Sequence, residues 1–233
     1  MFSFKRFSIL LVTAVIIIST VTAQQRKEMT PEESYLQESI EIMIIRETAR
    51  SYSRDQKLIA LEYIGEALNR GSTNDEIRQT LDFLSKEGRR ISARENGRLM
   101  NNYPDVRRQA VKYLGQIGTE EARKNLIDIS TSENEPMVLQ EVIKSLGDIG
   151  ANPNNETVKT ISWVFGTMNS SKETDNLVAL ATIDAFEKIA RKNNGISAPE
   201  VVRTLILISE GPYVTPVRER AKQLIAELRT YGR

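Results

Sequence analysis

Apolar residues recur along this chain at the spacing of one face of an α-helix. In residues 105–118, 137–150, 177–190 and 216–229 they fall at −4, 0, +1, +4 and +7 from a shared reference residue. This period of about 3.6 residues predicts amphipathic helices. A fifth, weaker copy begins at Asp55. No stretch alternates with period 2 for long enough to indicate a strand.

The reference residues are spaced as in a repeat protein. They are Ala60, Ala110, Val142, Thr182 and Ala221, at intervals of 50, 32, 40 and 39 residues. Further helical stretches lie between them, so we predict five helical hairpins, over about 31–70, 73–118, 119–150, 154–193 and 197–230. Because a single hairpin cannot bury both of its apolar sides, we expect an all-α fold in which the hairpins stack into a right-handed α-α superhelix.

Several residues have the chemistry of helix ends or of close helix contacts. Thr119 and Ser197 are positioned to cap the helices that follow them. Gly115 and Gly147 lie inside predicted helices, where glycine costs about 1 kcal/mol relative to alanine. We interpret them as packing residues that let a neighbouring helix approach, and not as a phosphate-binding loop.

The second helix of each hairpin resembles the HEAT repeat, in the bacterial HEAT-like form also found in phycobilisome lyases. The similarity is sharpest over residues 104–118, where the family's Asp-x-Arg pair corresponds to Asp105 and Arg107. Asp55 and Lys57 match it weakly, and the last copy keeps only Arg218. The resemblance implies an α-solenoid whose Asp-x-Arg pair stabilises the ladder between repeats. It implies little about function, because one fold carries many functions.

The first 23 residues have the plan of a secretory signal peptide. Lys5 and Arg6 precede an uncharged apolar stretch at 7–21, and small residues lead up to Ala23. The stretch is shorter than the roughly 20 residues of a membrane-spanning helix. We therefore expect cleavage after Ala23 and an exported repeat domain over residues 24–233. An uncleaved anchor stays open as the alternative, and it would be the chain's only link to a membrane.

The composition excludes several classes of chemistry. The chain has 32 basic and 31 acidic residues, no cysteine and no histidine. It therefore has no disulfide, no Cys or His metal ligand, and no Ser-His-Asp or Cys-His catalysis. An exported protein without cysteine favours a bacterial periplasm. A net charge near zero argues against nucleic acid, and no motif for a cofactor or a small-molecule substrate is present.

Charge is nevertheless segregated, and the strongest basic block is a candidate binding site. Residues 86–112 hold 8 basic and 3 acidic side chains, and the insertion at 86–102 lengthens the first interval to 50 residues. Loops, arginine and tyrosine are common in interfaces. The candidate partner-binding residues are Arg89, Arg90, Arg94, Arg98 and Tyr103, with Arg108, Lys112 and Lys144 on the second helices. The alternative is a basic, solvated helix or loop between repeats. Asp105 and Arg107 are interpreted as a structural ion pair.

These features favour an exported, non-catalytic scaffold or adaptor that binds a protein partner. A narrower version places it in a periplasmic, flagellar or envelope assembly. Two alternatives stay open: a lyase, by analogy with HEAT-like bilin lyases, and a membrane-anchored interaction module. The role of Trp163, which lies beside the apolar stripe of its helix, also stays open between packing and an exposed anchor.

Overall fold

A computed structural model describes residues 30–169 and 174–231 of the chain. These residues form ten α-helices, one short 3-10 helix and a two-stranded β-hairpin. The elements are α2 (Pro31–Arg50), α3 (Arg54–Asn69), α4 (Asp75–Ser85), β1 (Arg94–Glu95), β2 (Arg98–Leu99), α5 (Pro104–Ile117), α6 (Glu120–Ser130), α7 (Pro136–Ile149), η1 (Pro153–Asn155), α8 (Glu156–Asn169), α9 (Asn176–Asn193), α10 (Pro199–Glu210) and α11 (Thr215–Leu228). Each predicted hairpin range contains one pair of these helices.

The chain divides into two units, Met1–Ile40 and Glu41–Arg233, so α2 spans their boundary. The predicted signal peptide at 1–23 lies outside the described residues. Within the part of the chain that the structure describes, no helix is long and apolar enough to cross a membrane.

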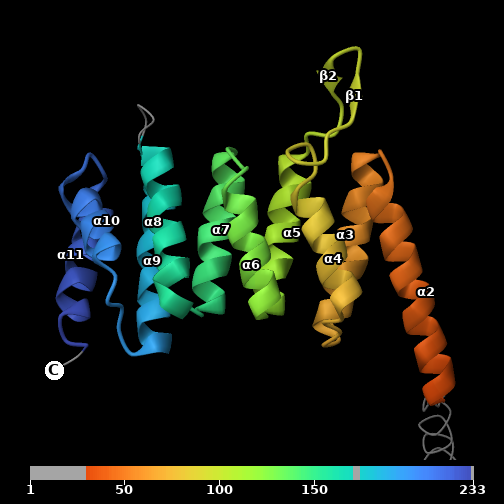
Figure 1. Cartoon of the computed structure of the whole chain (residues 1–233), viewed down its shortest axis with the longest axis horizontal. Helices are drawn as coiled ribbons and strands as arrows, with labels where there is room; N and C mark the ends of the chain where they lie inside the picture. Colours follow the sequence, from red (N-terminus) through yellow and green to blue (C-terminus); the bar gives the residue numbers. More distant parts are fainter. Residues whose placement is uncertain (1–29, 170–173, 232–233) are drawn as a thin grey trace, which may run out of the picture. The chain divides into compact units, whose positions relative to one another are not determined.

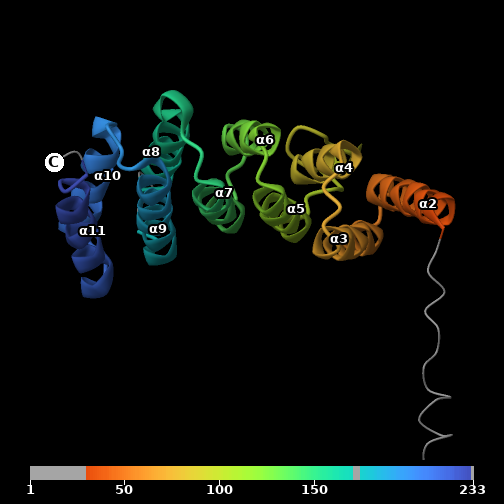
Figure 2. The ribbon, with the colours of Figure 1, turned by 90° about the horizontal axis from the view of Figure 1, so that it is seen from below.

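Helices of the second unit are arranged in two layers. Figure 1 shows α3 to α11 following one another in sequence order, and Figure 2 separates them into layers. The first helices α4, α6, α8 and α10 form one layer, and the second helices α3, α5, α7, α9 and α11 form the other. From α4 onward, each helix packs against its own partner and against the equivalent helix of a neighbouring pair. This arrangement confirms the expected all-α, HEAT-like repeat array.

The core lies between the two layers and continues along the array. The reference residues, Ala60, Ala110, Val142, Thr182 and Ala221, are all fully buried. They are joined by the apolar residues at the other positions of the stripe, such as Leu114, Leu146 and Phe186. The helical period therefore located the buried face of every second helix. Trp163 is 52% exposed on α8, so packing in the core is not its role.

One of the two helix caps predicted from the sequence is confirmed. Thr119 caps α6, because its hydroxyl accepts a hydrogen bond from the Ala122 amide at 3.2 Å. The predicted cap at Ser197 is wrong: Ala198 occupies the N-cap of α10. The Ser197 hydroxyl instead accepts a hydrogen bond from Asn155 at 3.4 Å, a contact from the preceding helix pair that the local sequence does not show.

The glycines inside α5 and α7 are sites of close helix approach, as predicted. A Cβ at Gly147 would lie 2.6 Å from the Cα of Ala185 on α9, and one at Gly115 would lie 2.6 Å from Ser145 on α7. A methyl group at Gly147 would therefore meet neighbouring backbone. Absence of a side chain at these two positions sets how closely consecutive second helices pack.

We predict that replacing two helical glycines by alanine will have opposite effects. Gly147→Ala should lower the free energy of unfolding by about 1–3 kcal/mol, because it overpacks the α7–α9 contact. Gly166→Ala is the matched control: no atom of a described residue lies within 4 Å of its added Cβ. It should gain about 1 kcal/mol from helix propensity. Urea unfolding followed by circular dichroism measures both changes, and equal shifts in the two variants would contradict the close-contact interpretation.

Candidate partner-binding site

The basic insertion between α4 and α5 contains a β-hairpin. Arg94 pairs with Leu99 and Glu95 with Arg98 in antiparallel register. Asn96 and Gly97 form the turn, and both have positive φ, at 49° and 80°. An Asn-Gly turn with this backbone suits a two-residue hairpin because its twist matches that of the paired strands. Figure 1 shows β1 and β2 extending beyond the ends of α4 and α5.

A buried polar network holds the base of this hairpin. The Asn101 side chain donates to the Glu87 carboxylate at 2.5 Å and to the Ile91 carbonyl at 2.7 Å, and it accepts from the Ala93 amide at 2.8 Å. Glu87 in turn pairs with Lys57 of α3 at 3.1 Å, with both side chains buried. A buried charge is costly unless it is paired and hydrogen-bonded. The base of the hairpin is therefore fixed to the neighbouring helix pair.

Arg107 of α5 ties the same base to the next helix pair. Its buried guanidinium donates to the Glu87 carbonyl at 3.1 Å and to the Asn102 side chain at 2.9 Å. It also pairs with the buried Glu133 at 2.6 Å. Arg89 reaches the same carboxylate at 3.6 Å. Glu133 lies in the turn between α6 and α7, so one carboxylate joins the hairpin segment to the following repeat.

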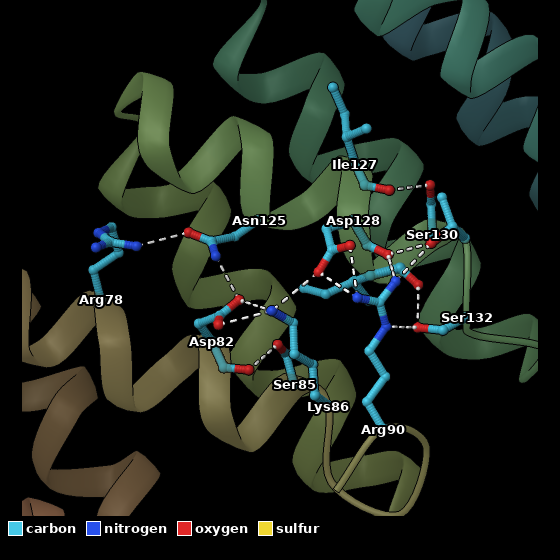
Figure 3. Close-up of polar contacts among 12 residues, drawn as sticks. Arg78, Asp82, Ser85, Lys86, Arg90, Asn125, Ile127, Asp128, Ser130 and Ser132 are labelled. Atoms are coloured by element: carbon cyan, nitrogen blue, oxygen red, sulfur yellow. Dashed lines mark hydrogen bonds and ion pairs between the residues drawn. The ribbon is translucent and has the colours of Figure 1, made fainter.

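Lys86 and Arg90 are held by α6, as Figure 3 shows. Lys86 bridges Asp82 and Asp128, at 2.8 and 3.1 Å. Partial burial would lower the pKa of Lys86, but the hydrogen bonds to the two carboxylates outweigh it and raise the pKa. Arg90 donates to the Asp128 carboxylate at 2.9 Å and to the Ser132 hydroxyl at 3.1 Å. These cations fasten the insertion to the repeat array.

A row of ion pairs also links consecutive second helices. Each pair joins one helix to the next: Arg54 to Asp105 (2.6 Å), Arg108 to Glu141 (3.3 Å), Lys188 to Asp148 (2.6 Å) and Arg220 to Asp184 (3.3 Å). Lys144 approaches the same Glu141 at 3.6 Å. Because most of these side chains are exposed, each pair adds little to stability by itself. As a result, many charged side chains on the surface of the second helices are paired with one another.

The interpretation of Asp105 and Arg107 as an ion pair with each other is wrong. Asp105 pairs with Arg54 on the preceding second helix, and Arg107 pairs with Glu133 on the far side. Because Asp105 and Arg107 are two residues apart on a helix, their side chains point about 200° apart around its axis. Each therefore reaches a different neighbouring repeat, which agrees with the ladder role that the resemblance implies.

The structure separates the eight candidate binding residues into two groups. Four contact other elements of the protein: Arg89, Arg90 and Arg108 as above, and Tyr103, whose hydroxyl donates to the Tyr52 carbonyl at 3.2 Å. Four remain presented to solvent: Arg94, Arg98, Lys112 and Lys144, whose ion pair is with Glu141 of its own helix. The Arg94 guanidinium donates to the Gly97 carbonyl of its own hairpin at 3.2 Å. A binding role for these residues stays a prediction.

The residues that anchor the hairpin were not singled out from the sequence. Glu87, Asn101 and Glu133 are isolated polar residues in connecting segments, and no periodicity marks them. Lys57 carried a signal, since it stands three residues before Ala60, as Arg107 stands before Ala110. Among the residues described, no group of three or more acidic side chains is arranged to hold a metal ion.

We predict that removing the Asn101 side chain will loosen the hairpin while leaving the helices intact. In Asn101→Ala, hydrogen exchange at the amides of Ala93 and Met100 should accelerate about tenfold. The Ala93 amide loses its acceptor, and the backbone hydrogen bond from Met100 to Ala93 then opens more often. Exchange at the buried Val111 amide of α5 should not change. The exposed Ser92→Ala in the same segment is the control, and an equal acceleration there would contradict the anchoring role of Asn101.

Residues 98–191 match a family of HEAT repeats. The complex of CpcE and CpcF of phycocyanin lyase from Nostoc sp. PCC7120 shares the fold, with a TM-score of 0.54 over 88% of this chain and 67% of that chain, at 16% sequence identity. A de novo designed 16-helix transmembrane nanopore covers 84% of this chain and 61% of its own at 15% identity, but its TM-score of 0.27 carries no argument. No curated protein matches the sequence. The family match therefore shows HEAT repeats over residues 98–191, within a HEAT-like array of stacked helix pairs.

Proposed function

We propose that this chain is a non-catalytic scaffold that binds a protein partner, and that the hairpin segment of residues 91–100 makes the contact. The observation that carries this proposal is the contrast between the base and the tip of the hairpin. The base is held by buried ion pairs and hydrogen bonds, while Arg94 and Arg98 at the tip are exposed. A rigid base limits the conformational entropy that such a contact loses on binding.

The chemistry of the tip favours an acidic protein surface. Arg94 and Arg98 present guanidinium groups suited to bidentate pairing with carboxylates. Met100, 46% exposed at the end of β2, adds a flexible apolar side chain beside them. Basic charge on a projecting segment also raises the rate of encounter with an acidic partner.

Protein binding suits the fold. A stacked repeat array displays long surfaces without needing a catalytic centre. The structure that shares this fold is itself described as a complex of two proteins, CpcE and CpcF. At 16% identity the likeness extends to the fold, so lyase activity is not carried over to this chain.

We further propose that the scaffold is exported and works in a bacterial periplasm, as part of an envelope or flagellar assembly. The support is the arrangement of residues 1–23, in which two basic residues precede an uncharged apolar stretch and then small residues. The absence of cysteine from the whole chain suits a bacterial exported protein.

Charge reversal at the hairpin tip should reduce capture of the partner. In the double variant Arg94→Glu and Arg98→Glu, crosslinking pull-down from the native cells should recover about tenfold less partner, an affinity change of ~1.4 kcal/mol. The matched control reverses two exposed cations outside the hairpin, Lys124→Glu on α6 and Arg203→Glu on α10. Equal recovery with both double variants would refute the role of the hairpin. Arg89 and Arg90 are left unchanged, because their loss would damage the anchor.

The exported protein should begin at Gln24. Sequencing the N-terminus of the protein from the periplasmic fraction checks this directly, since signal peptidase removes the segment that ends in small residues. An intact Met1 on the exported protein would show that the segment stays attached as an anchor.

A further inference from the structure

A cleft of about 630 Å³ lies beside the hairpin base, where the connections within helix pairs meet. Its apolar floor includes Leu139 of α7, Phe165 of α8 and Val178 of α9, with Tyr213 from the turn between α10 and α11. Glu133 forms part of its rim and also pairs with Arg107 and Arg89. Glu133 therefore lies both at the cleft and among the ion pairs that anchor the base of the hairpin.

The cleft opens where the repeat pattern changes. Arg107 stands three residues before the reference position of α5, and its long side chain fills the space beside Glu87 and Glu133. The equivalent residue of α7 is Leu139, and that of α9 is Ala179. Neither can reach across to the next connection as an arginine does. An apolar floor is left in place of a buried ion pair.

The charged residues of the described cleft lining are acidic. Its described lining includes two carboxylates, Glu133 and Asp175, and no lysine or arginine. Arg107 balances Glu133, whereas Asp175 is exposed and caps α9 through the amides of Leu177 and Val178. Burial, and then the charge of Asp175, raise the pKa of Tyr213. The field of Asp175 therefore reaches the floor.

Amide side chains complete the rim. Asn176 accepts from the Val214 amide at 3.0 Å through its carbonyl oxygen, which leaves its NH2 group to donate to a ligand. Asn134, exposed on the opposite side of the rim, can both donate and accept. Amide groups flanking an apolar floor suit the alternating N–H and C=O groups of an extended peptide.

We propose that the cleft binds an extended segment of a partner protein, which places one large apolar side chain on the floor and a lysine or arginine next to Asp175. The volume falls within the roughly 300–1,000 Å³ of ligand pockets, and the charge of the rim complements a basic residue. This inference deepens the proposed function and rests on it: the same partner contacts the hairpin with an acidic surface and the cleft with this segment.

Fluorescence anisotropy with defined peptides tests the proposal on the whole exported protein. The probe is fluorescein-labelled Gly-Ser-Phe-Lys-Ser-Gly, compared with peptides in which Glu replaces the Lys or Ala replaces the Phe. The Phe-Lys peptide should bind about tenfold more tightly than either of the others, a difference of ~1.4 kcal/mol. Equal affinity for all three peptides, or no binding of any, would overturn the proposal.

Variants of the protein locate the bound peptide. Leu177 is exposed and lines the cleft, and Leu180 is exposed one turn further along α9 outside it. Leu177→Lys should weaken binding about tenfold by repelling the basic residue, a change of ~1.4 kcal/mol, while Leu180→Lys should leave it unchanged. Asp175→Asn keeps a good helix cap and should abolish the preference for Lys over Glu. Equal weakening by both leucine variants would place binding elsewhere.

A further variant separates the cleft from the hairpin. The variant with Arg94→Glu and Arg98→Glu should keep its affinity for the peptide. If this variant loses partner capture and the peptide binds neither it nor the unaltered protein, the cleft proposal is refuted and the proposed function of the hairpin stands. If the peptide binds and this variant still captures as much partner as the unaltered protein, the hairpin contact is refuted and the cleft proposal stands.

Discussion

Burial of each second helix against the next is the constraint on which this structure depends. No helix pair can cover its own apolar surface, so the stripe of α5 is completed by α7, and that of α7 by α9. Two glycines, at 115 and 147, set the spacing of these contacts, since a methyl group at either would overlap the neighbouring helix. Stability therefore accumulates along the array, and the connecting segments are free to differ in length and chemistry.

The connecting segments are in turn ordered by buried cations. Lys57, Arg107 and Arg123 are each nearly inaccessible, and each pairs with a carboxylate from another segment or helix. Arg123 pairs with Glu120 of its own helix at 2.6 Å and with Glu156 of α8 at 2.7 Å, and the second pair joins α6 to α8. Burying such charges gains little net free energy. Removing one partner is costly, so these pairs select one arrangement of the connections over others.

Helix packing stabilises the array and buried cations order its connections, and these two roles explain where the proposed contacts lie. The two-layer array supplies a stable frame, and the cations on α3 and α5 fix a long insertion that would otherwise be a solvated loop. Because the base of the hairpin is held in place, its tip presents Arg94 and Arg98 to solvent. Further along, where Leu139 replaces the arginine, the ion pair gives way to an apolar cleft. Both features arise from variation at one position of the repeat.

The sequence by itself determined the helices, their pairing and their buried faces, because these depend on a local period of 3.6 residues. It also identified Gly115 and Gly147 as packing residues. Only the tertiary structure decided what the charged residues do. Arg90, 38 residues from Asp128, and Arg107, 26 residues from Glu133, find their partners across repeats, and no local pattern encodes such pairs. The basic block of residues 86–112 is thus largely an anchor, because stacking brings carboxylates to the base of the hairpin. Its unpaired cations are Lys112 on α5 and those of the hairpin tip, where none of the described carboxylates pairs with Arg94 or Arg98.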